Sequence, residues 1–204
     1  DPVELSLARI RQLSAHEIGH TLGFAHNFAA STNDRASVMD YPAPYVRPTA
    51  AGGLDFSNAY ASGIGEWDKV AATWLYSEFK PGTDEKPALD AIIKSAYARG
   101  LRFVDDAQAR GVDGAQPYGS VWDNGDDPVI ALTETMRVRE IALSHFGDNA
   151  IQAGRPTSGL KSILAPIYLY HRYQVDAAAK LIGGYEFRYA LKGDGPHAGI
   201  PVDA

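Results

Sequence analysis

Three histidines and one glutamate fall within eleven residues near the start of the chain. Residues 16–26 read H-E-I-G-H-T-L-G-F-A-H, which is the pattern H-E-x-x-H-x-x-G-x-x-H. On a helix, His16 and His20 project from one face, because residues four apart lie on the same side, so both imidazoles can bind one metal ion. Gly23 allows the helix to end and the chain to turn, which brings His26 back as a third ligand. A fourth position is left for water, as in catalytic zinc sites.

The glutamate between the first two histidines supplies the acid–base chemistry of such a site. Glu17 lies about 100° around the helix from His16, so it can reach a metal-activated water without being the third ligand. The pattern therefore predicts a Zn²⁺ cofactor and Glu17 as the general base. Five fixed residues at this spacing arise by chance on the order of once in millions of start positions. The alternative is a buried helix with hydrogen-bonded histidines, but three of the six histidines lie in this segment.

The composition is typical of a soluble globular protein and excludes several other classes. The chain has 204 residues, a formal net charge of -6 and 45% hydrophobic residues, with no basic run that would bind nucleic acid. No apolar run approaches the length of a membrane span. Cysteine is absent, so the chain forms no disulfides.

The first part of the chain predicts two helices separated by a long loop. Residues 3–24 form one helix whose apolar residues lie on two sides, which predicts a buried, central helix. Residues 27–63 are rich in proline and glycine, and this irregular segment is expected to wall a substrate cleft. A helix over 66–79 closes the zinc-binding part. Its tryptophans, Trp67 and Trp74, share one helical spacing with other apolar residues, which favours core packing over ligand contact.

The rest of the chain predicts a second, helical part. One helix follows a cap at Thr83 and ends at Gly100, and two more span residues 128–146 and 160–182. Short strands at 101–104 and 185–191 are candidate partners in a single small hairpin. The predicted fold class is therefore mainly α, with a zinc-binding domain over residues 1–80 and a helical subdomain over residues 81–204.

Two polar or aromatic segments in this second part have alternative interpretations. The acidic segment 123–127 either binds calcium or forms a turn in which Asp127 caps the helix that starts at Pro128. The aromatic residues of the last helix either line a substrate pocket or pack in the core; they are Tyr168, Tyr170, His171 and Tyr173. His197 is assigned no role.

The methionine of a second motif lies thirteen residues beyond the third histidine. Residues 37–42 read S-V-M-D-Y-P, and with the histidine motif they resemble the Met-turn of the metzincin metallopeptidases. The resemblance implies that Met39 forms a hydrophobic base beneath the metal, whereas alone it would be ordinary core filler. In the astacin-like and serralysin-like branches a tyrosine at the position of Tyr41 approaches the zinc. This implies that Tyr41 ligates the metal at rest and donates to the oxyanion; the alternative is a packed surface tyrosine.

The resemblance extends to the rest of the chain. With the motifs G-E-W-D-K, Y-H-R-Y-Q and A-K-L-I-G-G, the sequence looks like the C-terminal part of long, uncharacterised bacterial zinc-dependent metalloproteases. Asn27 departs from the well-known branches, which carry Glu, Asp, Ser or Pro after the third histidine. The resemblance implies an exported protein that acts on a peptide or protein substrate. Metzincins place a sheet before the active-site helix, so we expect a fragment of a longer protein, with the upstream domain as its partner.

The function that these observations favour is a zinc-dependent endopeptidase. A zinc hydrolase of non-peptide amides or esters would use the same residues. A non-catalytic zinc-binding interaction module is the third interpretation. The intact Glu17 argues against it, because a structural zinc site needs no base and usually has four protein ligands.

Overall fold

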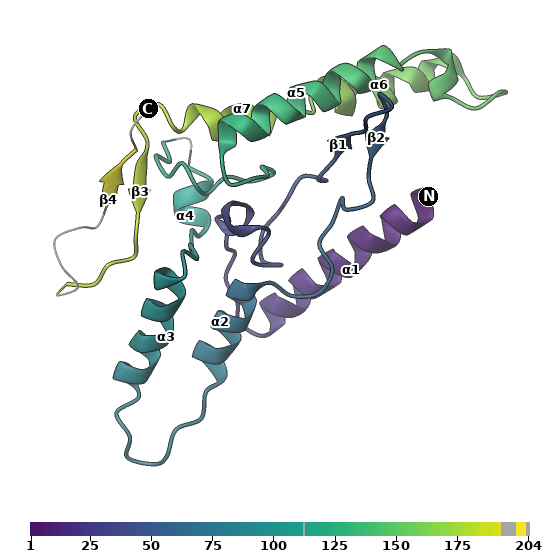
Figure 1. The fold of residues 1–204 in the computed structure, drawn as a ribbon. Helices are drawn as coiled ribbons and strands as arrows, with labels where there is room; N and C mark the ends of the chain where they lie inside the picture. The colour runs from purple at the N-terminus through teal and green to yellow at the C-terminus, as the bar shows by residue number, and fades with distance from the viewer. Residues whose placement is uncertain (112, 193–198, 203–204) are drawn as a thin grey trace.

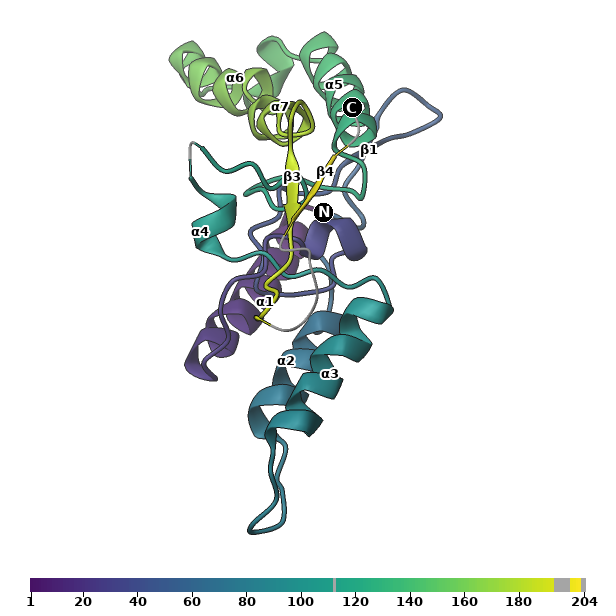
Figure 2. The same ribbon diagram turned by 90° about the vertical axis from the view of Figure 1, so that its left-hand side faces the viewer.

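The computed structural model describes residues 1–111, 113–192 and 199–202, and the chain in these ranges is mainly helical, as predicted (Figure 1). Helices α5, α6 and α7 run together along one side of the molecule, and α2 and α3 form a hairpin that extends from the other side (Figures 1 and 2). His197 lies outside the described residues. In chain order the elements are α1 (Pro2–Thr21), η1 (Ala30–Asn33), β1 (Arg47–Pro48), β2 (Leu54–Asp55), α2 (Glu66–Tyr76), α3 (Lys86–Ala98), α4 (Asp106–Ala109), α5 (Pro128–Ser144), η2 (Asp148–Ala150), η3 (Thr157–Gly159), α6 (Leu160–Tyr168), α7 (Arg172–Ala179), β3 (Tyr185–Phe187) and β4 (Gly199–Pro201).

Helix α1 ends three residues before the predicted position, at Thr21, and the predicted glycine ends it. Gly23 has a φ of +86°, a conformation that favours glycine. The amide of Gly23 donates to the carbonyl of His20 at 3.0 Å, and the amide of Phe24 donates to the carbonyl of Gly19 at 3.0 Å. This pair of bonds is the Schellman arrangement, which turns the chain away from the helix axis.

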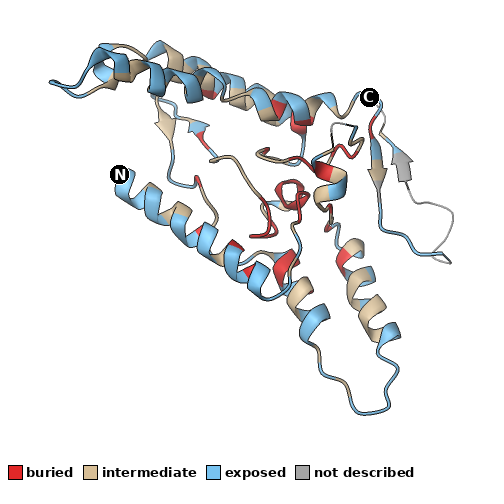
Figure 3. Ribbon diagram, turned by 180° about the vertical axis from the view of Figure 1, so that it is seen from behind, coloured by how far each residue is buried: buried red, intermediate tan, exposed pale blue. Residues whose placement is uncertain are grey.

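The prediction that α1 is buried is wrong. The helix buries Gln12, His16 and Gly19 on one side, and most of its remaining surface is exposed (Figure 3). The described residues pack against this one side only, so the second apolar face stays in contact with solvent. Its exposed apolar side chains include Val3, Leu7, Ile10, Leu13 and Ile18.

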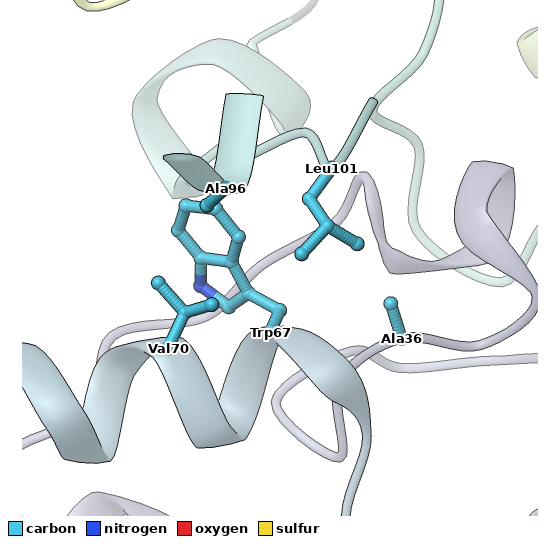
Figure 4. Packing of buried hydrophobic residues seen from close by; sticks show 5 residues of the cluster. All are labelled: Ala36, Trp67, Val70, Ala96 and Leu101. Atoms are coloured by element: carbon cyan, nitrogen blue, oxygen red, sulfur yellow. The ribbon is translucent and has the colours of Figure 1, made fainter. Parts of the chain in front are cut away.

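The α2–α3 hairpin contains a small hydrophobic cluster. Trp67 is 7% exposed and stacks on Phe103 with ring centroids 5.3 Å apart, which confirms its predicted place in the core. Trp74 is 41% exposed, so the same prediction is wrong for that residue. The buried members of the cluster are Ala36, Trp67, Val70, Ala96 and Leu101 (Figure 4).

Helix α3 begins later than the sequence predicts. Its first residue is Lys86, and Thr83 makes no capping bond to it. Proline is favoured in the first turn of a helix, and Pro87 sets the start here. Asp84 accepts a hydrogen bond from the Lys86 amide at 3.2 Å. The predicted end is confirmed, since Gly100 has a φ of +82° just past the helix.

The predicted pairing of strand 101–104 with strand 185–191 is wrong. Strand β3 pairs with β4 in an antiparallel register, and residues 101–104 belong to no sheet in the described structure. They instead bond to the segment after the third histidine. The carbonyl of Val104 accepts from the Phe28 amide at 2.8 Å, and the Val104 amide donates to Asn27 Oδ1 at 3.1 Å. A second antiparallel pair, β1 with β2, lies within the loop that was predicted to be irregular.

The C-terminal helices begin where predicted but end earlier, α5 at Ser144 and α7 at Ala179. Asp127 accepts from the amides of Val129 and Ile130 at 2.8 and 3.0 Å, so its predicted capping of α5 is confirmed. The predicted single helix over 160–182 is two helices, α6 and α7. Arg139 Nε donates to the Tyr168 carbonyl at 2.9 Å. In a continuous helix that carbonyl would accept from the Arg172 amide.

None of the helices in the described ranges has the length and apolar character needed to cross a membrane.

Candidate metal centre

The three motif histidines converge. Each of His16, His20 and His26 offers a ring nitrogen, and these three atoms lie within 4.8 Å of one another. The ring centroid of His20 lies 4.7 Å from that of each neighbour. Helix α1 presents the first two rings, and the turn at Gly23 returns the third ring to them, as the motif predicts.

Each of these imidazoles is held through its Nδ1 atom by an acceptor. Carbonyl and carboxylate oxygens accept, so each Nδ1 carries the hydrogen, and in the neutral ring Nε2 then carries a lone pair. This is the tautomer of a histidine that binds metal through Nε2, with the acceptor orienting the ring. The three bonds run from His16 to the Val38 carbonyl at 2.8 Å, from His20 to the Phe24 carbonyl at 3.1 Å and from His26 to the Asp106 carboxylate at 2.6 Å.

The arrangement fits a metal ion. His16 Nε2 is buried without a hydrogen-bond partner among the described residues. The Nε2 atoms of His20 and His26 face each other at 3.1 Å, and two lone pairs at this distance repel unless a cation lies between them. A tetrahedral zinc with bonds of about 2.0–2.1 Å holds its ligand nitrogens about 3.3 Å apart. Burial lowers the pKa of His16, and the hydrogen bond to the Val38 carbonyl opposes that shift.

Met39 lies against the backbone of α1. It is 1% exposed, and its sulfur would lie 2.2 Å from a Cβ atom added at Gly19. Gly19 is the residue before His20, so the methionine packs directly on the turn of helix that carries the candidate ligands. The close approach explains why this motif position holds a glycine here.

Helix α2 fixes the Met-turn through one buried carboxylate. The buried Asp68 carboxylate accepts from Ser37 Oγ at 2.6 Å, from the Val38 amide at 2.9 Å and from the Gly65 amide at 2.7 Å. The Val38 carbonyl is in turn the acceptor for His16. Sequence reasoning did not identify Asp68, because an acidic residue in the first turn of a helix is common for capping alone.

The two residues predicted to take part in catalysis are Tyr41, which contacts a candidate ligand, and Glu17, which is exposed. The Tyr41 hydroxyl is 3.2 Å from His26 Nε2, and its ring stacks on Trp122 with centroids 5.5 Å apart. Glu17 is exposed on α1. The Tyr41 hydroxyl therefore lies at the candidate metal centre.

A cavity of about 730 Å³ opens beside Tyr41. Of the four aromatic residues singled out in the last predicted helix, Tyr173 lines it, which fits the pocket interpretation for that residue. The Tyr170 hydroxyl instead donates to the Pro44 carbonyl at 2.9 Å, and Tyr168 is 56% exposed. The cavity is lined in part by Tyr41, Arg110, Trp122, Tyr173, Asp176 and Lys180.

Two residues of the acidic segment 123–127 have separate structural roles. Asp127 caps α5, while Asp123 is buried and accepts from Ser31 Oγ at 3.4 Å. Among the described residues, His16, His20 and His26 are placed to hold a metal ion together, and residues 123–127 form no such group. Burial raises the pKa of Asp123 to about 7 and that of Asp40 well above its usual range.

Two further residues support the centre and were not identified from the sequence. Asp106 follows His26 by 80 positions, so no local pattern connects them. Asn27 differs from the residues found in the well-known branches, but that difference alone did not reveal its function. The backbone amide of Asn27 donates to the Met39 carbonyl at 3.0 Å, and its side-chain Nδ2 donates to the Arg102 carbonyl at 3.0 Å. It therefore joins the Met-turn to the segment that leads into α4.

Comparison with known protein families gives a match over the whole chain. The model of a family described as Met-zincin matches residues 1–204, the whole chain. No curated protein and no solved structure matches it. The family match and the cluster of three histidines suggest a zinc metallopeptidase, and the cluster fits zinc binding. The chain belongs to the Met-zincin family.

Proposed function

We propose that this protein is a zinc-dependent endopeptidase. One observation carries the proposal: ring nitrogens of three histidines converge, and a separate oxygen acceptor holds the Nδ1 atom of each ring. Such a site binds a cation with three protein ligands, which leaves a position for water and substrate. The family match supports peptide-bond hydrolysis and a protein substrate.

In this proposal His16, His20 and His26 hold the zinc. When bound, zinc supplies a Lewis acid that polarises the scissile carbonyl and lowers the pKa of a water toward about 7. The Glu17 carboxylate accepts a proton from the attacking water and passes it to the leaving amine nitrogen. The Tyr41 hydroxyl donates a hydrogen bond to the carbonyl oxygen as that oxygen gains negative charge. The hydroxyl position beside His26 supports this assignment.

We further propose that an upstream domain of the same parent protein covers the second face of α1. The exposed apolar side chains of that face support this, since a contiguous apolar surface is commonly an interface. We also propose an exported location, which rests on the sequence resemblance alone.

Removal of the general base tests the proposed chemistry. Glu17→Ala is expected to leave the zinc content unchanged and to abolish peptide cleavage, because the histidines remain and the proton acceptor is lost. Metal analysis and digestion of a peptide library measure the two effects. Glu4→Ala, at an exposed position on the same helix, is the matched control and is expected to retain activity.

The outcomes separate the three interpretations. Full activity of the Glu17 variant contradicts the mechanism. Hydrolysis of model esters or amides without peptide cleavage supports a non-peptide hydrolase. Zinc binding without any hydrolysis by the wild-type protein supports an interaction module.

A further inference from the structure

We infer that Asp106 is a positioning residue that orients His26 for metal binding, an inference that rests on the proposed zinc site. Asp106 Oδ2 lies 2.6 Å from His26 Nδ1. Backbone carbonyls hold the other two candidate ligands, so Asp106 is the one charged acceptor among the three. A carboxylate on the Nδ1 hydrogen fixes the ring and makes its Nε2 more basic, which strengthens metal binding.

The Asp106 carboxylate is itself held in place. Arg110 Nε lies 2.8 Å from its Oδ1 atom, so one oxygen faces the guanidinium and the other faces the imidazole. Asp106 is the first residue of α4, and Asp105 caps this short helix by accepting from the amides of Ala107 and Gln108 at 3.0 and 3.3 Å. The carboxylate therefore points at His26 from a backbone with satisfied hydrogen bonds.

A backbone pairing sets the separation between Asp106 and His26. Asn27 directly follows the histidine, and its Oδ1 accepts from the Val104 amide at 3.1 Å. The next amide, that of Phe28, donates to the Val104 carbonyl at 2.8 Å. Because Asp106 lies two residues beyond Val104, these two bonds place its side chain beside that of His26.

The C-terminal segments hold α4 from the other side. Lys180 Nζ donates to the Ala109 carbonyl at 3.1 Å and to the Gly119 carbonyl at 2.9 Å. The Tyr189 hydroxyl accepts from the Asp105 amide at 3.0 Å. The position of Asp106 thus depends on contacts with residues near both ends of the chain. An isolated ion pair at the surface would not need such contacts.

Zinc affinity of the whole chain, measured by competition with a chelator, tests the inference. Asp106→Ala is expected to weaken zinc binding by about 10- to 100-fold, the usual effect of removing such an acceptor, and Asp106→Asn by less. The thermal melting temperature of the metal-free protein is expected to stay near that of the wild type, because the Asp106 side chain is 48% exposed. Asp126→Asn, which removes one exposed charge elsewhere, is the control and is expected to leave affinity unchanged.

A double-mutant cycle asks whether Asp106 acts through His26. In the His26→Ala background, Asp106→Ala is expected to cause no further loss of zinc affinity, because the ligand that it orients is gone. An equal loss in both backgrounds overturns the inference, as does unchanged affinity of Asp106→Ala in an otherwise wild-type chain that binds zinc. If the wild-type chain itself binds no zinc, the proposed function fails. Unchanged zinc affinity of Asp106→Ala in a chain that does bind zinc contradicts only the role of Asp106, so the two failures are distinguishable.

Discussion

At the scale of single residues, glycines and buried carboxylates decide how closely the parts of the centre approach. Gly19 allows the Met39 sulfur to rest on α1. Gly65 allows α2 to approach the Met-turn, since a Cβ atom there would lie 1.9 Å from the Ala36 carbonyl oxygen. The spacing of the sequence motif predicts neither contact. Each contact forms only when the two segments that make it pack together in the folded chain.

Enlarging Gly19 is expected to destabilise the protein. In Gly19→Ala the new methyl group overlaps the Met39 sulfur, and overpacking of this kind costs about 1–3 kcal/mol of unfolding free energy. Urea unfolding of the metal-free protein measures the change. Gly147→Ala is the control, because Gly147 has extended backbone and no atom within 4 Å of the added methyl group. Equal stability of the two variants would contradict the close packing.

The buried Asp123 is expected to make stability fall as pH rises. Burial raises its pKa in the folded state from 3.8 to about 7, so the folded state holds a proton that the unfolded state releases. Its stabilising contribution is complete below the unfolded pKa and is lost as pH rises through the folded pKa. Histidines titrate in the same range, so the comparison is with Asp123→Asn, whose unfolding free energy should decline less between about pH 4 and 7. Parallel pH profiles of the two proteins would refute the assignment.

At the scale of elements, the first turn of α2 is the support of the Met-turn. One carboxylate, that of Asp68, accepts three hydrogen bonds there, and it is 2% exposed. Through the Val38 carbonyl the same contact reaches His16. The helix therefore stabilises the base of the metal centre without touching the metal.

Loss of the Asp68 carboxylate is expected to be costly. Asp68→Ala leaves buried donors without an acceptor, at about 1–3 kcal/mol for each unsatisfied group. The expected result is a large fall in unfolding free energy in chemical denaturation, with weaker zinc binding because the Val38 carbonyl is no longer fixed. Glu66→Gln is the control on the same helix, since Glu66 is exposed and pairs only with surface cations. A stability loss no larger than that of the control would argue against the role of Asp68.

At the scale of the whole molecule, the centre joins segments that are far apart in the sequence. α1, the Met-turn and α4 meet at His26, while most of the surface of α1 is exposed (Figure 3), including several apolar side chains. The division into residues 1–80 and 81–204 stays a prediction. Contacts cross that boundary at the His26–Asp106 pair and at the Trp67–Phe103 stack. The second part of the chain thus supplies part of the candidate metal centre.

The sequence alone determined the features that depend on neighbouring residues. The spacing of His16 and His20 follows from helical geometry, and Gly23 turns the chain because only glycine readily takes its conformation. The caps and stops at Asp127 and Gly100 are local in the same sense. These are short-range effects of backbone geometry, so a pattern of a few residues is enough to predict them.

Tertiary structure decided what depends on distant partners. Asp106 reaches His26 across 80 positions, and Arg139 donates to the Tyr168 carbonyl at the residue where α6 ends. The exposure of one face of α1 likewise depends on which segments pack against it. In each case a side chain or a surface has several possible partners of similar energy, and only the packing of the complete fold selects one of them.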